Sequence, residues 1–141
     1  MEHSRRGRPL HVTIVSDNPE TTDGLEFYLR RAGVTTTGTR HIEKASEMTP
    51  PASSAVVLFP DDFRSEAVTS ALASLRTQRP SALPVLVTKE PKQFELLPSS
   101  DGGLLPLVVP KPVWGWTILD AIRARLDSES PKRELGLRNL P

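Results

Sequence analysis

The sequence predicts an α/β fold in which a five-stranded parallel sheet carries helices on both faces. Short strand-like runs alternate with helix-like segments along the chain, and short loops join them. Fourteen prolines among 141 residues indicate many short elements with firm ends. A chain of this length forms one domain, since about 150 residues per domain is usual.

A change in the spacing of the apolar residues predicts the first strand and the first helix. Apolar and polar residues alternate over residues 10–15, which is typical of a strand that enters a core. Asn18 is a candidate N-cap, and Pro19 takes the first helical position, where its missing N–H costs nothing. Gly33 supplies the left-handed stop. The apolar residues of this helix are Leu25, Tyr28, Leu29 and Ala32.

The next segment predicts an edge of the sheet. Residues 34–39 are rich in β-branched side chains but poor in apolar ones, which indicates an edge strand. Residues 41–48 form a weak helical pattern with Ile42 and Ala45 turned inward, and residues 49–54 have the composition of a loop.

The most apolar run of the chain, residues 55–59, predicts a central buried strand. A helix over residues 65–79 follows, and Pro80 ends it. The buried stripe of this helix consists of Val68, Ala71, Leu72 and Leu75. Residues 84–88 predict the fourth strand.

One more strand and one more helix complete the predicted fold. Residues 92–97 are loosely helical, residues 99–103 form a turn, and residues 104–109 form a strand that Pro106 interrupts. The apolar face of the last helix consists of Ile118, Leu119, Ile122 and Leu126.

Composition excludes several classes of protein. Eighteen basic against seventeen acidic residues give a net charge of +1, so no overall field attracts nucleic acid or an anionic membrane. The absence of cysteine excludes disulfides, thiolate metal sites and thiol catalysis, and it is compatible with a reducing cytoplasm. No apolar run approaches the roughly 18 residues of a membrane span, and residues 1–9 have no signal-peptide pattern. We expect a cytoplasmic protein without a membrane partner.

The carboxyl ends of the strands are the expected functional edge, because ligands of open parallel sheets gather there. The residues that follow the first, third, fourth and fifth strands are Ser16 and Asp17, Pro60 with Asp61 and Asp62, Thr88 and Lys89, and Pro110 with Lys111 and Pro112.

In this order the strand ends resemble the receiver domain of bacterial two-component response regulators, the CheY-like family with a (βα)5 flavodoxin-like fold. A receiver has an acidic pair after its first strand, an aspartate at the end of the third, Ser or Thr ending the fourth, and Lys-Pro ending the fifth. Ser16 and Asp17 resemble the first feature, Thr88 the switch hydroxyl, and Lys111 with Pro112 the last. The resemblance covers about residues 10–126 and implies a cis peptide bond before Pro112.

The resemblance also shows where this sequence departs from the family. In a receiver the acidic pair and the aspartate bind Mg²⁺, the aspartate attacks a phosphoryl group, and the lysine holds the transferred oxygens. Here Ser16 replaces one acid, and Pro60 stands where the nucleophile belongs. The resemblance therefore implies a divergent pseudo-receiver without the phospho-acceptor aspartate, without a catalytic residue, and without a metal or other cofactor.

Two neighbouring acids keep an alternative open. A slip of one residue along a strand reverses the side chain, so Asp61 should point away from Asp17 and Lys111 unless the loop bends back. Asp61 and Asp62 then form a solvated lead-in to a helix, while Asp17 complements the dipole of the first helix. Lys111 is expected to persist in a structural ion pair with the nearby Asp17. The alternative is a phosphorylatable response regulator that uses Asp61 or Asp62.

Two tryptophans lie outside the receiver pattern. Trp114 and Trp116 flank Gly115 at the start of the last helix, and side chains two residues apart on a helix cannot both face one core. We expect one of them to be exposed and to anchor a protein partner, with a homodimer as one case. The competing interpretation is that both pack the corner beside Gly115.

The chain ends carry a further alternative. Arg5 precedes a run, Arg6 to Pro9, that resembles the core of an AT-hook, which lies in the minor groove of A·T-rich DNA. We expect a basic flexible arm over residues 1–9, a receiver-like domain over residues 10–127 and a flexible tail over residues 128–141. The three histidines, His3, His11 and His41, form no metal set.

These observations predict a phosphorylation-independent, receiver-like module for protein interaction in bacterial signal transduction, and not an enzyme. A DNA-associated regulator that uses the arm from Arg5 to Pro9 is the alternative from another class.

Overall fold

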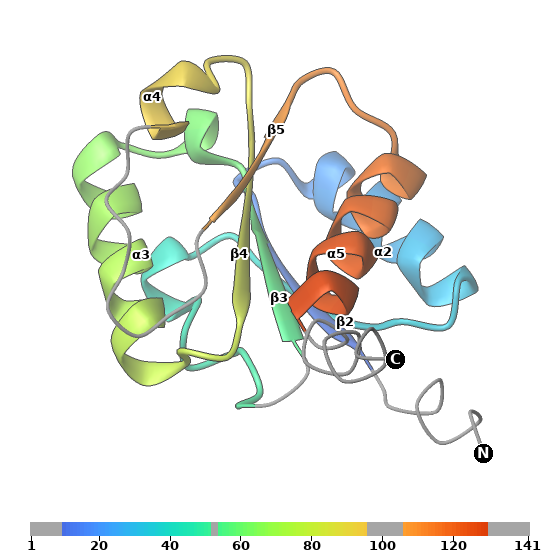
Figure 1. Ribbon diagram of the computed structural model, residues 1–141. Helices are drawn as coiled ribbons and strands as arrows, with labels where there is room; N and C mark the ends of the chain where they lie inside the picture. Colours follow the sequence, from blue (N-terminus) through green and yellow to red (C-terminus); the bar gives the residue numbers. More distant parts are fainter. Residues whose placement is uncertain (1–9, 52–53, 96–105, 130–141) are drawn as a thin grey trace, which may run out of the picture.

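The computed structural model describes residues 10–51, 54–95 and 106–129. Its sheet has five parallel strands in the order β2-β1-β3-β4-β5, which confirms the predicted fold class (Figure 1). The order changes direction at β1, so the ends of β1 and β3 form the switch point at which ligands of such sheets bind. The strands are β1 His11–Val15, β2 Thr35–Thr39, β3 Ser54–Leu58, β4 Leu83–Thr88 and β5 Leu107–Pro110.

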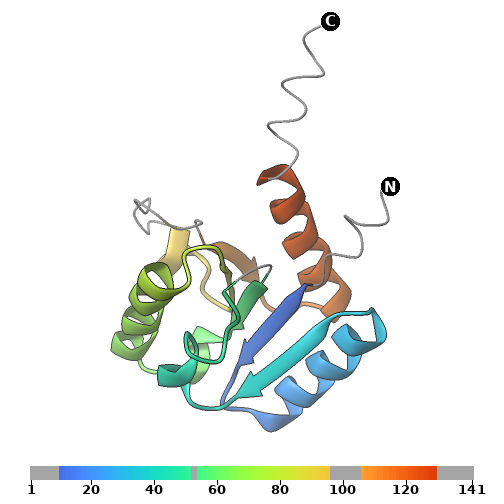
Figure 2. The ribbon, with the colours of Figure 1, turned by 90° about the horizontal axis from the view of Figure 1, so that it is seen from below.

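Helices cover both faces of the sheet. Helices α2 and α5 lie against one face, whereas α3 and a short 3-10 turn, η1, lie against the other (Figures 1 and 2). A second 3-10 turn, η2, follows β3. The bounds are α2 Pro19–Arg31, α3 Ser65–Gln78, α4 Lys92–Glu95, α5 Gly115–Glu129, η1 Ile42–Lys44 and η2 Pro60–Asp62.

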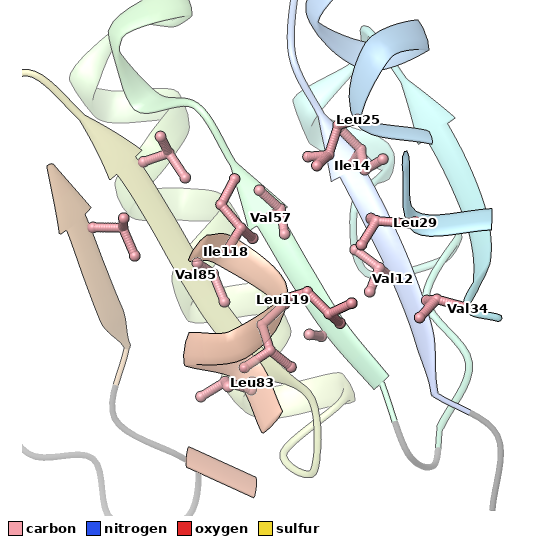
Figure 3. Close-up of a cluster of buried hydrophobic side chains, with 14 of the residues drawn as sticks. Val12, Ile14, Leu25, Leu29, Val34, Val57, Leu83, Val85, Ile118 and Leu119 are labelled. Atoms are coloured by element: carbon pink, nitrogen blue, oxygen red, sulfur yellow. The ribbon is translucent and has the colours of Figure 1, made fainter. Parts of the chain in front are cut away.

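Alternation along the central strand β3 divides the core into two clusters. Ala55 and Val57 pack on the side of α2 and α5, and Val56 and Leu58 pack on the side of α3. Figure 3 shows the first cluster, in which Ile118 and Leu119 of α5 lie over β3 and β4 while Leu25 and Leu29 of α2 lie over β1. All five residues of β3 are buried, as predicted for a central strand.

The predicted caps of the first helix are confirmed. The Asn18 side chain accepts a hydrogen bond from Glu20 N at 2.9 Å, and Pro19 is the first helical residue. Gly33 has a φ of 90°, the left-handed conformation that a glycine adopts without strain. Together these residues fix both ends of α2 beside β1 and β2.

The predicted edge strand is confirmed, because among the described strands β2 pairs only with β1. The predicted helix over residues 41–48 is wrong: only η1 forms there, followed by turns, although Ile42 and Ala45 are buried as expected. The Thr49 hydroxyl donates to the Ala45 carbonyl at 2.7 Å, and Pro50 cannot extend a helix. Two inward residues give too little apolar face for a full helix.

Several predicted segments fall partly or wholly outside the described residues. The arm over 1–9, the turn over 99–103 and the tail from residue 130 onward lie outside them. The predicted piece over residues 92–97 is described only as α4, and the last strand begins at Leu107, one residue after Pro106. Helix α5 continues to Glu129, two residues into the predicted tail. None of the helices in the described ranges is long and apolar enough to cross a membrane.

Candidate functional site

The site forms where the carboxyl ends of neighbouring strands continue side by side. Phe59 N donates to the Val15 carbonyl at 3.1 Å, so the chain after β3 stays beside β1. Lys111 N donates to the Thr88 carbonyl at 2.9 Å, so the chain after β5 stays beside β4. The residues just past four strands therefore share one edge of the sheet.

The turn η2 determines where the acids after β3 point. Pro60 is buried at its first position, where a fixed φ suits the turn and no N–H is needed. Asp62 N donates to the Phe59 carbonyl at 3.0 Å, and Phe63 N donates to the Pro60 carbonyl at 3.1 Å. The chain thus folds back over the strand ends directly after β3.

Asp61 reaches the ends of β4 and β5. The Thr88 hydroxyl donates to its Oδ1 at 2.7 Å, and Lys89 N donates to its Oδ2 at 2.9 Å. Lys111 Nζ lies 3.4 Å from the same Oδ2, and both side chains of this ion pair are about three-quarters buried. Burial alone would raise the pKa of Asp61, but the hydrogen bonds from Thr88 and Lys89 and the charge of Lys111 hold that pKa below its ordinary value.

The expectation that Asp61 points away from Lys111 is therefore wrong. Strand alternation governs side-chain direction only as far as Leu58, because the next residues belong to η2 and not to the strand. The carboxylate beside Lys111 and Thr88 is that of Asp61, while Pro60 is buried at the start of the turn.

Asp62 contacts the residues that follow β1, at the same edge of the sheet. Its Oδ2 accepts from Ser16 Oγ at 2.7 Å and from Asp17 N at 3.0 Å. The Ser16 hydroxyl is fully buried and accepts from Asn18 N at 3.1 Å, which aims its proton at Asp62. Asp62 is thus a bridge to β1 and not the solvated lead-in that the sequence predicts.

Asp17 turns away from the other acids. Its side chain is 58% exposed, and its Oδ1 lies 3.3 Å from Nη2 of Arg40, the residue that follows β2. The predicted ion pair between Asp17 and Lys111 is therefore wrong, and Lys111 pairs with Asp61 instead. The reason is that β2, which delivers Arg40, is the neighbour of β1 in the sheet, whereas β5 lies at the opposite edge.

These positions do not fit the Mg²⁺ site that a typical receiver has at these strand ends. In the described part of the chain, no group of three His, Cys, Asp or Glu side chains could hold a metal ion. Asp61 and Asp62 receive separate sets of donors, and Asp17 faces Arg40. The oxygens that a hard cation needs are directed to different partners.

The backbone at Lys111 and the Phe59 ring both restrict the position of the Lys111 side chain. The predicted cis peptide bond between Lys111 and Pro112 is confirmed. Lys111 Nζ lies 5.6 Å from the centroid of the Phe59 ring, within reach of a cation–π interaction. The ammonium therefore has a defined position between the Phe59 ring and the Asp61 carboxylate.

Both tryptophans are exposed, although we expected exposure of only one, and the competing interpretation that both pack the corner beside Gly115 is wrong. Trp114 is 66% and Trp116 51% exposed, and their rings stack with centroids 5.2 Å apart and planes at 3°. Helical spacing does not apply to the pair, because α5 begins at Gly115 and Trp114 precedes it. Gly115 lies against α2, where an added Cβ would come within 3.0 Å of the Tyr28 ring.

Arg40 and Lys89 complete the contacts of the strand ends, although sequence reasoning did not assign them roles. Arg40 follows the predicted edge strand directly, and this position is the only sequence signal that connects it to Asp17. Lys89 contributes a backbone amide, which any residue type supplies, so its identity carries no signal.

The remaining predicted candidates do not join this site. The His11 ring bridges the Thr35 and Thr37 hydroxyls at 2.8 Å each on the edge strand, and partial burial lowers the pKa of His11. His41 lies 3.8 Å from a Glu43 carboxylate. His3 and the arm from Arg5 to Pro9 lie outside the described residues.

Comparison with solved structures identifies the fold. The chain is similar to a sensor protein from Polaromonas sp. JS666, at 22% identity and a TM-score of 0.63, over 86% of this chain and 98% of that one. It is similar to the signal receiver domain of an HD domain-containing protein from Pseudomonas fluorescens Pf-5, at 21% identity and a TM-score of 0.64, over 90% of this chain and 93% of that one. It is also similar to a CheY-like response regulator receiver domain protein from Methanospirillum hungatei JF-1, at 18% identity and a TM-score of 0.59, over 88% of this chain and 98% of that one.

No protein-family model matches the sequence, and no curated protein matches it. The likeness to solved structures shows a receiver fold of the flavodoxin-like type.

Proposed function

We propose that this domain is a phosphorylation-independent, receiver-like module that binds a protein partner in bacterial signal transduction. The receiver fold of the similar structures supports the signalling context. The observation that carries the proposal is that both oxygens of the Asp61 carboxylate are already engaged, by Thr88, Lys89 and Lys111.

An engaged carboxylate is a poor phosphoryl acceptor. To attack phosphorus, Asp61 would have to release hydrogen bonds that, for charged groups, each contribute about 1.5–3 kcal/mol. Phosphoryl transfer also relies on a cation that neutralises the developing charge, and Asp17 lies toward Arg40, away from Asp61. The domain accordingly acts by binding and not by catalysis, and it needs no cofactor.

The tryptophan pair is the surface that this function uses. Trp114 and Trp116 present two stacked indoles with more than half of each side chain in solvent. Tryptophans of this kind are frequent anchors of protein interfaces, because one large ring desolvates much area at little entropic cost. The partner is a protein, and a second copy of this chain is one such partner.

Incubation with acetyl phosphate and Mg²⁺, followed by intact-mass measurement, tests the proposal. We expect no phosphoryl adduct, and we expect beryllofluoride with Mg²⁺ to leave the amide NMR signals of Thr88 and Lys89 unchanged. An adduct that maps to Asp61 or Asp62 would overturn the proposal.

A phosphorylatable response regulator with Asp61 as acceptor is the second candidate function. The 3.4 Å contact between Lys111 Nζ and the Asp61 carboxylate favours it, because a receiver lysine must reach the oxygens of the transferred group. Under this alternative, Asp61→Asn would abolish the adduct, while Asp62→Asn would retain it.

A further inference from the structure

The side of β2 that faces away from β1 is an open edge of the sheet (Figure 2). Thr35 N donates to the Leu10 carbonyl at 3.3 Å, and the Thr39 carbonyl accepts a hydrogen bond from the chain after β1 at 3.2 Å. Both residues therefore direct their backbone groups toward β1. Because this direction alternates along a strand, Thr36 and Gly38 each direct an amide and a carbonyl toward the open edge.

The composition of β2 leaves the open edge without the usual protection against pairing. The strand consists of four threonines and one glycine, whereas natural edge strands often carry lysine, proline or a bulge. No strand of the described residues engages the outward groups of Thr36 and Gly38. A chain that runs antiparallel to β2 can pair with all four groups through two of its residues, spaced two positions apart.

Two side chains of α2 place opposite charges above the two ends of this edge. Arg30 Nε donates to the Thr36 hydroxyl at 2.8 Å, so Arg30 is level with Thr36. A Cβ on Gly38 would lie 2.6 Å from the Thr22 methyl group, so Asp23, the next residue, is level with Gly38. Seven residues make almost two helical turns, so both charges lie on one side of α2. Both are exposed, and they line one groove on the surface of that helix.

We propose that the open edge of β2 binds an extended segment of a partner protein, which adds a sixth strand antiparallel to β2. The segment carries a basic side chain at the residue opposite Gly38 and an acidic side chain two residues later, opposite Thr36. Residues two apart share one face of a strand, so these side chains meet Asp23 and Arg30. The inference goes beyond the proposed function, because it concerns another surface than the tryptophan pair.

The two kinds of contact have different roles in this interaction. Backbone pairing with Thr36 and Gly38 supplies affinity for any extended chain, as in other cases of strand addition. The charges of Asp23 and Arg30 supply direction and selectivity, because a segment with the reversed order of charges would be repelled at both ends.

A second copy of this chain fits the open edge less well than a single extended segment. The outward groups belong to Thr36 and Gly38, so two copies would pair around a two-fold axis at Thr37. Helix α2 covers β2, as the contact of Arg30 with Thr36 shows, so the α2 helices of both copies would meet over the junction. Adjacent strands lie only about 4.8 Å apart, whereas packed helices need about 8–10 Å. A segment without a helix has no such conflict.

Titration of the ¹⁵N-labelled protein with a short capped peptide tests the proposal. The peptide alternates threonine with, in order, valine, lysine, glutamate and valine. We expect saturable movement of the Thr36 and Gly38 amide signals, because these amides gain acceptors. A peptide with lysine and glutamate exchanged should bind at least about threefold more weakly, since both ion pairs become repulsive. The proposal is overturned if neither signal moves at millimolar peptide, or if both peptides bind equally.

Methylation of the peptide backbone separates strand addition from attraction between charges. A methyl group on the backbone nitrogen of the lysine removes a bond to the Gly38 carbonyl and should abolish the movement of the signals. A methyl group on the threonine between lysine and glutamate should keep most of the binding, because that amide points away from β2. Equal binding of the two methylated peptides would contradict a paired strand.

A charge reversal on α2 tests the selectivity of the edge. Asp23→Lys should weaken binding of the original peptide at least about threefold. Asp120→Lys is the matched control, because it makes the same change at an exposed residue of α5. Equal effects of the two variants would overturn the assigned role of Asp23.

The same signals distinguish the other occupant and the proposed function. If the Thr36 and Gly38 signals move with the concentration of the protein alone, a second copy occupies the edge and the proposal is overturned. A phosphoryl adduct on the wild type would overturn only the proposed function, since strand addition at β2 requires neither an unmodified Asp61 nor the tryptophans.

Discussion

The Asp61 carboxylate links the stability of the domain to pH. Burial acts to raise its pKa, but Thr88, Lys89 and Lys111 together lower it in the folded state. A group with a depressed folded pKa contributes stability above its unfolded pKa, and this contribution is lost as the pH falls through the folded value. We expect the wild type to melt above Asp61→Asn at neutral pH, and this difference to shrink below about pH 4. Thermal melts of both proteins across the acid range measure it, and a difference that stays constant with pH would contradict the assignment.

A carboxylate in place of the Ser16 hydroxyl should destabilise the fold, because it would repel the neighbouring Asp62 carboxylate. The fully buried Ser16 hydroxyl lies 2.7 Å from Asp62, so Ser16→Asp would bring two carboxylates together, whereas Ser16→Asn adds similar volume without charge. We expect the aspartate variant to melt below the asparagine variant and to recover part of the loss in millimolar Mg²⁺. The wild type should not respond to Mg²⁺. Equal melting of the two variants would mean that the pocket accommodates the charge.

At the scale of elements, the approach of α2 to β2 depends on one missing side chain. A Cβ on Gly38 of β2 would lie 2.6 Å from the Thr22 methyl group of α2, and Thr22 is buried and stiff at χ1. Gly24 of α2 has open space around its Cα. We expect Gly38→Ala to lower the free energy of unfolding by about 1–3 kcal/mol through overpacking, and Gly24→Ala to raise it by about 0.5–1 kcal/mol. Denaturant unfolding measures both, and a neutral Gly38→Ala would show that α2 shifts freely.

Local pattern predicted most elements of this fold. The apolar run of β3, the cap at Asn18 and the stop at Gly33 are all set by residues close in sequence, and the structure confirms each of them. The prediction of a helix over residues 41–48 was wrong, because two inward apolar residues do not stabilise a helix when Pro50 follows closely.

The candidate site was less predictable, because its geometry depends on how elements begin and end. The orientation of Asp61 follows from the 3-10 turn after β3, and alternation along the strand carries no information about that turn. The exposure of Trp114 follows from its place one residue before α5. The pairing of Asp17 with Arg40 requires knowledge that β1 and β2 are neighbours.

For the whole molecule, the exposed indoles predict a separation between stability and association. Replacing both Trp114 and Trp116 by alanine should change the free energy of unfolding by only about 0.5–1.5 kcal/mol, mostly through loss of the stack. If a second copy is the partner, the wild type should gain mass with concentration in sedimentation experiments, and the double variant should stay monomeric. Phe27→Ala is the matched control. Phe27 is an aromatic residue of similar exposure (65%), but it lies on α2 and takes no part in the stack of Trp114 and Trp116. Association that survives in the double variant would assign the interface to another surface.

A single turn that fastens four strand ends also shapes how the molecule opens. The amides of Asp17 and Lys89 lie far apart in the sequence, yet both donate to adjacent carboxylates of η2. Both amides lose their carboxylate acceptors when η2 lifts from the sheet, so a single opening releases the two together. Hydrogen exchange should therefore find these two amides in one cooperative unit, with matching opening free energies that fall together when either carboxylate is removed.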